Sequence, residues 1–259
     1  MSSGHRPAKS VAAVLSVAAV ALGIGALARP LAARSRGSTA GPSPATEPQV
    51  STPACAWPTL IGTVVIDQVT ARRAPSPWAP PIASFGRVSP QGAPQVFDLG
   101  GSAEGSTGDV WVRALLPIRP NGTWGFVPET SLSLAEVPYR IVVDRERLTL
   151  TLWEGCTVLK VFPIGLGKES TPTPNGSFYI TSLLRPPIPD SIYGPYAYGL
   201  SAFSDAITNW KGGGVIGIHG TNDPSSIGDR RSHGCIRMYN HDIEELVPFL
   251  PLGTPVEIR

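Results

Sequence analysis

The chain has 259 residues and 42% hydrophobic residues, which is enough apolar material for one large domain or two small ones. Its formal net charge is only +2, and it has no basic stripe with interleaved aromatics, so the sequence argues against nucleic acid as a partner. Gly and Pro, at 28 residues each, favour turns and short strands over long helices.

The chain begins with a basic segment that precedes an uncharged apolar run at residues 11–28. Arg29 ends this run. Ala26 and Ala28 fit the small-residue pattern of a cleavage site, whereas the length of the run also suits a membrane anchor. Residues 1–30 therefore predict a signal peptide or a signal anchor, and both topologies stay open. Either one predicts export to the periplasm or cell wall, with the membrane as a partner if the segment is uncleaved.

Two regions follow before the part of the chain that is richest in pattern. Residues 31–56 contain mainly small, polar and Pro residues without any period, which predicts a linker. Residues 57–136 predict a small β domain, because short strand-like runs at 63–66, 95–99 and 109–115 are separated by Gly and Pro turns.

A tight turn is expected at Asn121 and Gly122, and Trp124, Phe126 and Val127 after it offer core residues. This layout resembles the SH3-like modules that often precede bacterial cell-wall enzymes. The resemblance implies either a wall-binding domain or one that only positions the rest of the chain, and both stay open.

The remaining region, residues 138–259, predicts a mostly-β domain. Residues 147–152 alternate cleanly, as in a half-buried strand, and are expected to pair with residues 139–143. Further strands are expected at 157–162, 177–181, 214–218 and 254–259. One short helix is expected from residue 242 to 247, with Asp242 and Glu245 as the two members of a capping box.

The chemistry-bearing residues are concentrated in residues 219–238, which hold two of the four His and one of the three Cys. A cysteine nucleophile needs a base nearby and aimed N–H groups for the oxyanion. His219, at the end of an expected strand, is the candidate base for Cys235, and His233 is a second candidate for lining the site. The N–H groups of Gly234 and Cys235 are candidate oxyanion donors.

Three motifs in this segment carry a family resemblance. They are HGTN at 219–222, SSIG at 225–228 and SHGCIRM at 232–238, with GLGK at 165–168 and TPTPNG at 171–176 upstream. Together they are similar to the L,D-transpeptidase catalytic domain, also called the YkuD domain, over residues 138–259. The resemblance implies a β-sandwich catalytic domain with one short helix.

The resemblance also implies the reaction. Cys235 would attack a peptidoglycan stem peptide at its third residue, terminal D-Ala would leave, and the thioester would pass to a neighbouring stem amine to form a 3→3 cross-link. His219 would be the general base, and the carbonyl of Gly220 beside it would complete the catalytic set. Ser232 and His233 would shape the site. No cofactor and no metal are implied, and carbapenems are expected to acylate the cysteine.

Four further residues are candidate substrate contacts: Arg237, Tyr196, Tyr198 and Asn222. Arg237 would bind a stem carboxylate, or it would pair structurally with Asp229 or Asp242. The tyrosines lie in a turn-rich segment that corresponds to a lid over the donor groove in the family, and plain packing is the alternative.

Two cysteines remain outside the motif. Cys55 and Cys156 would form a disulfide in an exported protein, or would be two free thiols. Cys235 stays free in either case.

Other functions stay open. Water as acceptor would make an L,D-carboxypeptidase, and a protein amine would make an anchoring acyltransferase. A cell-wall-binding protein with an inactive site is the non-enzyme alternative. A papain-like peptidase is disfavoured, because the Cys precedes its His in that class, whereas His219 precedes Cys235 here.

Overall fold

The computed structural model of the chain describes residues 58–208 and 213–259, which belong to one compact unit, Ser51–Arg259. The predicted export segment and linker, and Cys55 with them, lie outside the described residues. None of the helices in the described ranges is long and apolar enough to cross a membrane.

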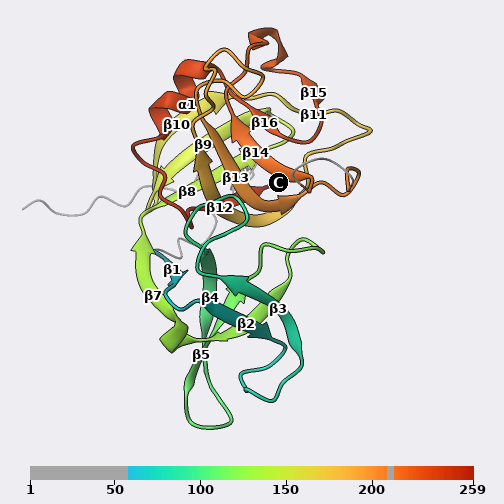
Figure 1. The fold of residues 1–259 in the computed structure, drawn as a ribbon. Helices are drawn as coiled ribbons and strands as arrows, with labels where there is room; N and C mark the ends of the chain where they lie inside the picture. Colours follow the sequence, from blue (N-terminus) through green and yellow to red (C-terminus); the bar gives the residue numbers. More distant parts are fainter. Residues whose placement is uncertain (1–57, 209–212) are drawn as a thin grey trace, which may run out of the picture. The chain divides into compact units, whose positions relative to one another are not determined.

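The first half of this unit is a seven-stranded antiparallel sheet in the order β3-β2-β6-β5-β4-β1-β7 (Figure 1). Its strands are β1 (Thr59–Val64), β2 (Gln68–Arg72), β3 (Pro81–Gly86), β4 (Val96–Glu104), β5 (Val110–Leu115), β6 (Trp124–Pro128) and β7 (Leu132–Val137), with a 3-10 turn at Glu129–Ser131. Alternate residues of these strands, such as Phe97 and Leu99, fill a small core. The β structure expected for this region is confirmed as a separate antiparallel sheet, and its status as a domain stays a prediction.

The sequence predicted β4 and β5, and the run expected at 63–66 overlaps β1 only at residues 63–64. It missed the other strands, and two of them, β2 and β3, show a physical reason. β2 buries only Val69 and Ala71, and β3 buries only Phe85. A strand whose buried residues are few or small, as alanine is, gives a weak apolar signal. Such strands form because their neighbours in the sheet supply the hydrogen bonds.

The second half is an eight-stranded sheet in the order β10-β9-β8-β17-β12-β13-β14-β16 (Figure 1). Its strands are β8 (Tyr139–Asp144), β9 (Thr149–Glu154), β10 (Thr157–Pro163), β12 (Gly176–Leu184), β13 (Ala197–Phe203), β14 (Val215–His219), β16 (Ile236–Arg237) and β17 (Pro255–Ile258). A two-stranded parallel pair, β11 (Leu166–Gly167) with β15 (Arg230–Ser232), lies apart from it in the sheet order.

The long strand β12 connects the two parts of this sheet. Its residues 176–179 pair with β17, and its residues 180–184 pair with β13, so the sheet curls around a single core. Every strand expected from the sequence in this half is present, and the pairing of 139–143 with the alternating strand after it is confirmed. The mostly-β fold with one helix is therefore as predicted.

The only helix of the described residues, apart from short 3-10 turns, is α1 (Asn240–Leu246), and its predicted capping box is wrong. The residue before the first turn is Tyr239, and no side chain caps the helix. Asp242 lies buried in the first turn, 3.1 Å from His241. A carboxylate in the first turn interacts favourably with the helix dipole, but here it does not cap the helix. Glu245 pairs with Lys160.

A small apolar cluster joins the two sheets. It consists of Val96 and Leu115 from the first sheet and Tyr179 from β12. The fully buried Tyr179 hydroxyl lies 3.2 Å from the carbonyl oxygen of Val96 and 3.1 Å from that of Leu115, and donates to this pair of acceptors. The contact satisfies a polar group that would otherwise be costly to bury.

Candidate active site

Two parallel strands bring the candidate nucleophile and base together. β14 pairs with β16 so that Ile218 lies beside Ile236 and His219 beside Arg237. Cys235 comes directly before β16, and the backbone N–H of Gly217 in β14 donates to its Sγ at 3.4 Å. Cys235 therefore lies beside Gly217, two residues before His219 on the neighbouring strand.

His219 is held in one protonation state and one tautomer. Its side chain is buried, and Nδ1 lies 2.5 Å from the carbonyl oxygen of Gly220. Because a carbonyl only accepts, Nδ1 must carry the proton, and a neutral ring then has a lone pair on Nε2. Burial lowers the pKa of His219 to about 4, and the hydrogen bond to Gly220 only partly opposes this. The neutral ring at pH 7 is thus equipped to accept a proton at Nε2.

The thiol of Cys235 is also neutral at rest. Burial raises its pKa above the ordinary value, and the Gly217 N–H and the charge of Arg237 oppose that rise. The site therefore holds a thiol and an imidazole rather than a preformed thiolate–imidazolium pair. Such a pair reacts only if the base removes the proton as the sulfur attacks.

The turn that presents Cys235 is closed by Ser232. Its hydroxyl donates to the carbonyl oxygen of Cys235 at 2.6 Å and accepts from the N–H of Gly234 at 3.1 Å. Gly234 has φ +120, which L-residues rarely adopt, and a Cβ there would lie 2.9 Å from Ile216 Cδ1. Ser232 therefore holds the turn, and the Gly234 N–H, a predicted oxyanion donor, is occupied by this hydrogen bond.

Residues far upstream hold the same turn from its other side. The buried Thr173 hydroxyl donates to the carbonyl oxygen of Gly234 at 2.9 Å and accepts from the N–H of Gly167 at 3.0 Å. Thr171 donates to the carbonyl oxygen of Ser232 at 3.2 Å. The upstream TPTPNG motif therefore supports the nucleophile. The sequence contains the motif but gives no sign of which atoms it contacts.

Asn240, at the start of α1, supports the base in a similar way. Its Oδ1 accepts from the N–H of Thr221 at 2.8 Å, and a Cβ on Gly220 would meet this oxygen at 2.4 Å. The close approach explains why glycine follows His219. Tyr193 packs edge-on against the His219 ring, with centroids 5.1 Å apart.

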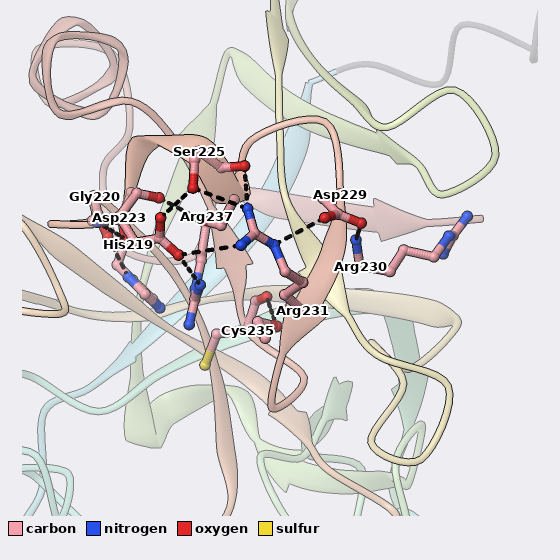
Figure 2. A network of polar contacts seen from close by, with 12 residues as sticks. His219, Gly220, Asp223, Ser225, Asp229, Arg230, Arg231, Cys235 and Arg237 are labelled. Carbon is pink, nitrogen blue, oxygen red and sulfur yellow. Dashed lines mark hydrogen bonds and ion pairs between the residues drawn. The ribbon is translucent and has the colours of Figure 1, made fainter.

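Arg237 lies beside His219 and takes part in a loose ionic network, as Figure 2 shows. Its Nη1 lies 3.8 Å from Asp223 Oδ2, and Arg231 lies 3.9 Å from the same oxygen. The predicted structural partners, Asp229 and Asp242, are wrong.

Those two carboxylates are engaged elsewhere, which explains the difference. Asp229 pairs with Arg231 at 2.9 Å, and Asp242 pairs with His241. The Nε of Arg237 is buried without a hydrogen-bond partner among the described residues.

A cavity of about 800 Å³, within the range of ligand-binding clefts, contains these groups. Its walls come from the turn around Cys235, from β14 and from the connections on both sides of β13. They include Ser182, Leu184, Arg185, Pro186, Pro187, Ile192, Tyr193, Ser204, Ile207, Gly214, Val215, Ile216, His219, Ser232, His233, Cys235 and Arg237. The candidate nucleophile, base and cation thus face one space.

The other predicted substrate contacts lie in different surroundings. Tyr198 borders the cavity but is fully buried in the core, and burial raises its pKa. Tyr196 packs against the core beneath Arg185, whose guanidinium carbon lies 5.7 Å from the ring centroid. Asn222 is exposed and outside the cavity lining.

The remaining cysteine assignment concerns Cys156, which is disulfide-bonded, whereas Cys235 is free. Cys55, its predicted partner, lies outside the described residues. Across 58–208 and 213–259, no three His, Cys, Asp or Glu side chains are grouped so that they could hold a metal ion.

Comparison with known proteins identifies the family of this chain. The family model described as the L,D-transpeptidase catalytic domain (YkuD) matches residues 138–258. The YkuD protein of Bacillus subtilis, named as an L,D-transpeptidase, is 44% identical over 124 residues, which is 48% of this chain and 67% of that protein. The YkuD protein of Bacillus licheniformis is 43% identical over 122 residues, 47% of this chain and 66% of its own length. The chain thus spans about two thirds of these relatives.

Solved structures are also similar to the chain. Bd1075 of Bdellovibrio bacteriovorus is 30% identical, with a TM-score of 0.39 over 48% of each chain. The L,D-transpeptidase LdtMt1 in complex with imipenem is 18% identical, with a TM-score of 0.40 over 62% of this chain and 98% of that one.

Proposed function

Because this chain belongs to the L,D-transpeptidase (YkuD) family, we propose that it is an exported enzyme that cross-links peptidoglycan stem peptides through a thioester on Cys235. The single observation that carries the proposal is that a buried His219, whose Nδ1 faces the Gly220 carbonyl, and the free thiol of Cys235 line one cavity. Export is supported by the uncharged run at residues 11–28.

The first half-reaction forms the thioester. Sγ of Cys235 attacks the carbonyl carbon of the third stem residue as Nε2 of His219 takes the thiol proton. The C–N bond to the terminal D-Ala then breaks, and the proton on His219 passes to the departing amine. The Gly220 carbonyl keeps Nδ1 protonated throughout and favours the imidazolium that forms. The Cys235 N–H is the proposed oxyanion donor, and the Gly234 N–H holds the turn.

The second half-reaction releases the acyl group to an acceptor. A side-chain amine on the third residue of a neighbouring stem attacks the thioester, and His219 takes its proton while the thiolate of Cys235 leaves. The product is a 3→3 cross-link, and the thiol is restored. The same chemistry with water would trim the stem instead.

Arg237 is the proposed site for a stem carboxylate. Arg237 lines the cavity, and its ion pair with Asp223 is long, at 3.8 Å, so a ligand carboxylate at the cavity wall can compete for its terminal guanidinium nitrogens. A planar guanidinium binds a carboxylate through two parallel hydrogen bonds.

The test uses purified chain with a stem tetrapeptide as both donor and acceptor, and mass spectrometry of the products. Wild type should release D-Ala and form a cross-linked dimer of the stems. Cys235→Ala and His219→Ala should lower turnover by about 10²–10⁴-fold or more.

His241→Ala is the matched histidine control, because His241 is exposed outside the cavity, and it should keep the wild-type rate. Tripeptide without dimer would replace the transpeptidase proposal by a carboxypeptidase. No D-Ala release by the folded wild type would overturn both.

A further inference from the structure

The turn between β5 and β6 of the first sheet makes polar contacts with the second sheet. The side-chain amide of Asn121 donates from Nδ2 to the carbonyl oxygen of Phe203 at 2.8 Å, and its Oδ1 accepts from the Phe203 N–H at 2.9 Å. Both backbone groups of the last residue of β13 are thus bound by one side chain. The amide takes the place that a neighbouring strand would fill.

Arg119, two residues earlier, extends this contact to the connection that follows β13. Its guanidinium donates to the carbonyl oxygens of Ser204 at 2.8 Å, Gly213 at 2.9 Å and Ile207 at 3.2 Å. It also lies over the Phe203 ring, 4.7 Å from the centroid. One side chain from the first sheet therefore gathers three carbonyls that lie on both sides of the residues 209–212.

The β13–β14 ladder ends at the pair of Phe203 with Val215, so these three carbonyls lie beyond it. The connection is also tightly folded at this point. Gly214 has φ +72, and a Cβ there would lie 2.2 Å from the Ile207 oxygen and 3.0 Å from Nη2 of Arg119. The described parts of the connection, 204–208 and 213–214, thus close around the guanidinium.

The same connection forms one wall of the active-site cavity. Ser204, Ile207 and Gly214 line the cavity that holds Cys235. Gly214 leads directly into β14, whose Gly217 N–H contacts the cysteine sulfur and whose last residue is His219. A change in this wall therefore alters the space that an acyl donor or acceptor would occupy.

We propose that Arg119 and Asn121 are positioning residues of the active site: the first sheet is a structural part of the substrate groove because these two side chains hold its β13–β14 wall. The substrate in question rests on the proposed function, whereas the contact itself does not. The buried contact of Tyr179 with Val96 and Leu115 fixes the two sheets together, so the wall is held against a firm support.

The experiment compares Arg119→Ala and Asn121→Ala with Arg113→Ala in the full chain. Arg113 is the matched control because its guanidinium stacks on Trp124 within its own sheet. Three quantities are measured: the kinetics on the stem tetrapeptide, the alkylation rate of Cys235 by iodoacetamide, and hydrogen exchange of the amides of residues 203–207.

The expected result is a selective loss of peptide binding. Arg119→Ala and Asn121→Ala should raise KM by about tenfold or more with kcat changed by less than about threefold, the signature of lost ground-state positioning. Iodoacetamide is too small to depend on contacts with the cavity wall, so the alkylation rate of Cys235 should stay within about twofold of the wild-type rate. The amides of Phe203, Ser204 and Ile207 should exchange at least tenfold faster. Arg113→Ala should change none of these.

Unchanged exchange in both variants would overturn the proposal, and so would faster exchange with unchanged KM. Equal losses of peptide and iodoacetamide reactivity would also overturn it, because they would indicate general damage to the nucleophile. If wild type does not act on the tetrapeptide, the proposed function fails by itself. The positioning role is then decided by hydrogen exchange together with the rate of acylation of Cys235 by a carbapenem, which should fall with Arg119→Ala.

Discussion

The buried His219 makes a definite contribution to how the stability of the protein depends on pH. In the folded protein its pKa is lowered from 6.5 to about 4, so between these values the unfolded chain binds a proton that the folded protein does not. The free energy of unfolding therefore falls as the pH drops through this window, and it is unaffected by this group above about pH 7. This lowering of the pKa predicts a loss of about 3 kcal/mol between pH 7 and pH 4.

The variant that isolates this contribution is His219→Gln, which does not titrate and can still donate to the Gly220 carbonyl. Urea unfolding at several pH values from 8 to 4 gives the free energy of unfolding of each protein. The advantage of wild type over the variant should be constant from pH 8 to 7 and should decrease by about 3 kcal/mol by pH 4.

Asp98 makes a contribution of the opposite sign. Burial raises its pKa to about 7, so the folded protein binds the extra proton below that pH and gains stability as the pH falls. Comparison with the variant removes this background, because Asp98 is present in both proteins. In Asp98→Asn, the acid loss of stability should be steeper than in wild type. Curves for wild type and His219→Gln that stay parallel from pH 8 to 4 would refute the assignment of His219 as a buried neutral base.

Three further outcomes are expected. Ser232→Ala leaves the Gly234 N–H without its acceptor and should lower the free energy of unfolding by about 1–3 kcal/mol. It should also slow the acylation of Cys235 by about tenfold or more. A wild-type rate in stopped-flow acylation would contradict the role of Ser232 in holding the turn. Gly234→Ala should cost about 1–3 kcal/mol, because φ +120 and the contact with Ile216 both resist a Cβ, and thermal unfolding measures this. The acid limb of kcat/KM should lie near pH 4 rather than 6.5, since His219 stays neutral until then; a limb at 6.5 would mean that the base is exposed.

Part of the second sheet was predictable from sequence because several of its strands alternate. In β9, Leu150 and Leu152 face the core while the threonines between them are half-buried, which is the period-two signal. In β2 the alternating buried residues are only Val69 and the small Ala71, and β3 buries only Phe85, so their apolar signal is weaker. The capping box failed because a Ser/Thr/Asp pattern does not determine which residue precedes the first helical turn. Local pattern thus predicts elements with large buried faces and misses those held by their neighbours.

The residues of the candidate site could be named from the sequence, and their catalytic roles stay predictions. Cys235 and His219 were found from their motif, and the structure brings them to one cavity. The supporting contacts were not predictable, because they join residues far apart in the sequence. Thr173 and Gly234 are 61 residues apart, and Arg119 and Gly213 are 94 residues apart. The partner of Arg237 depends on which carboxylates are already engaged, and the pKa of His219 depends on burial. Neither is encoded in the spacing of the motif.

The most direct test of the central claim is intact-protein mass spectrometry of the chain after incubation with a carbapenem, whose strained lactam carbonyl is an acyl donor for an activated thiol. The account predicts one adduct per wild-type chain, none on Cys235→Ala, and slower formation on His219→Ala but not on His241→Ala. A folded wild type that forms no adduct, or an adduct that persists in Cys235→Ala, would contradict the assignment of Cys235 as an acyl-accepting nucleophile.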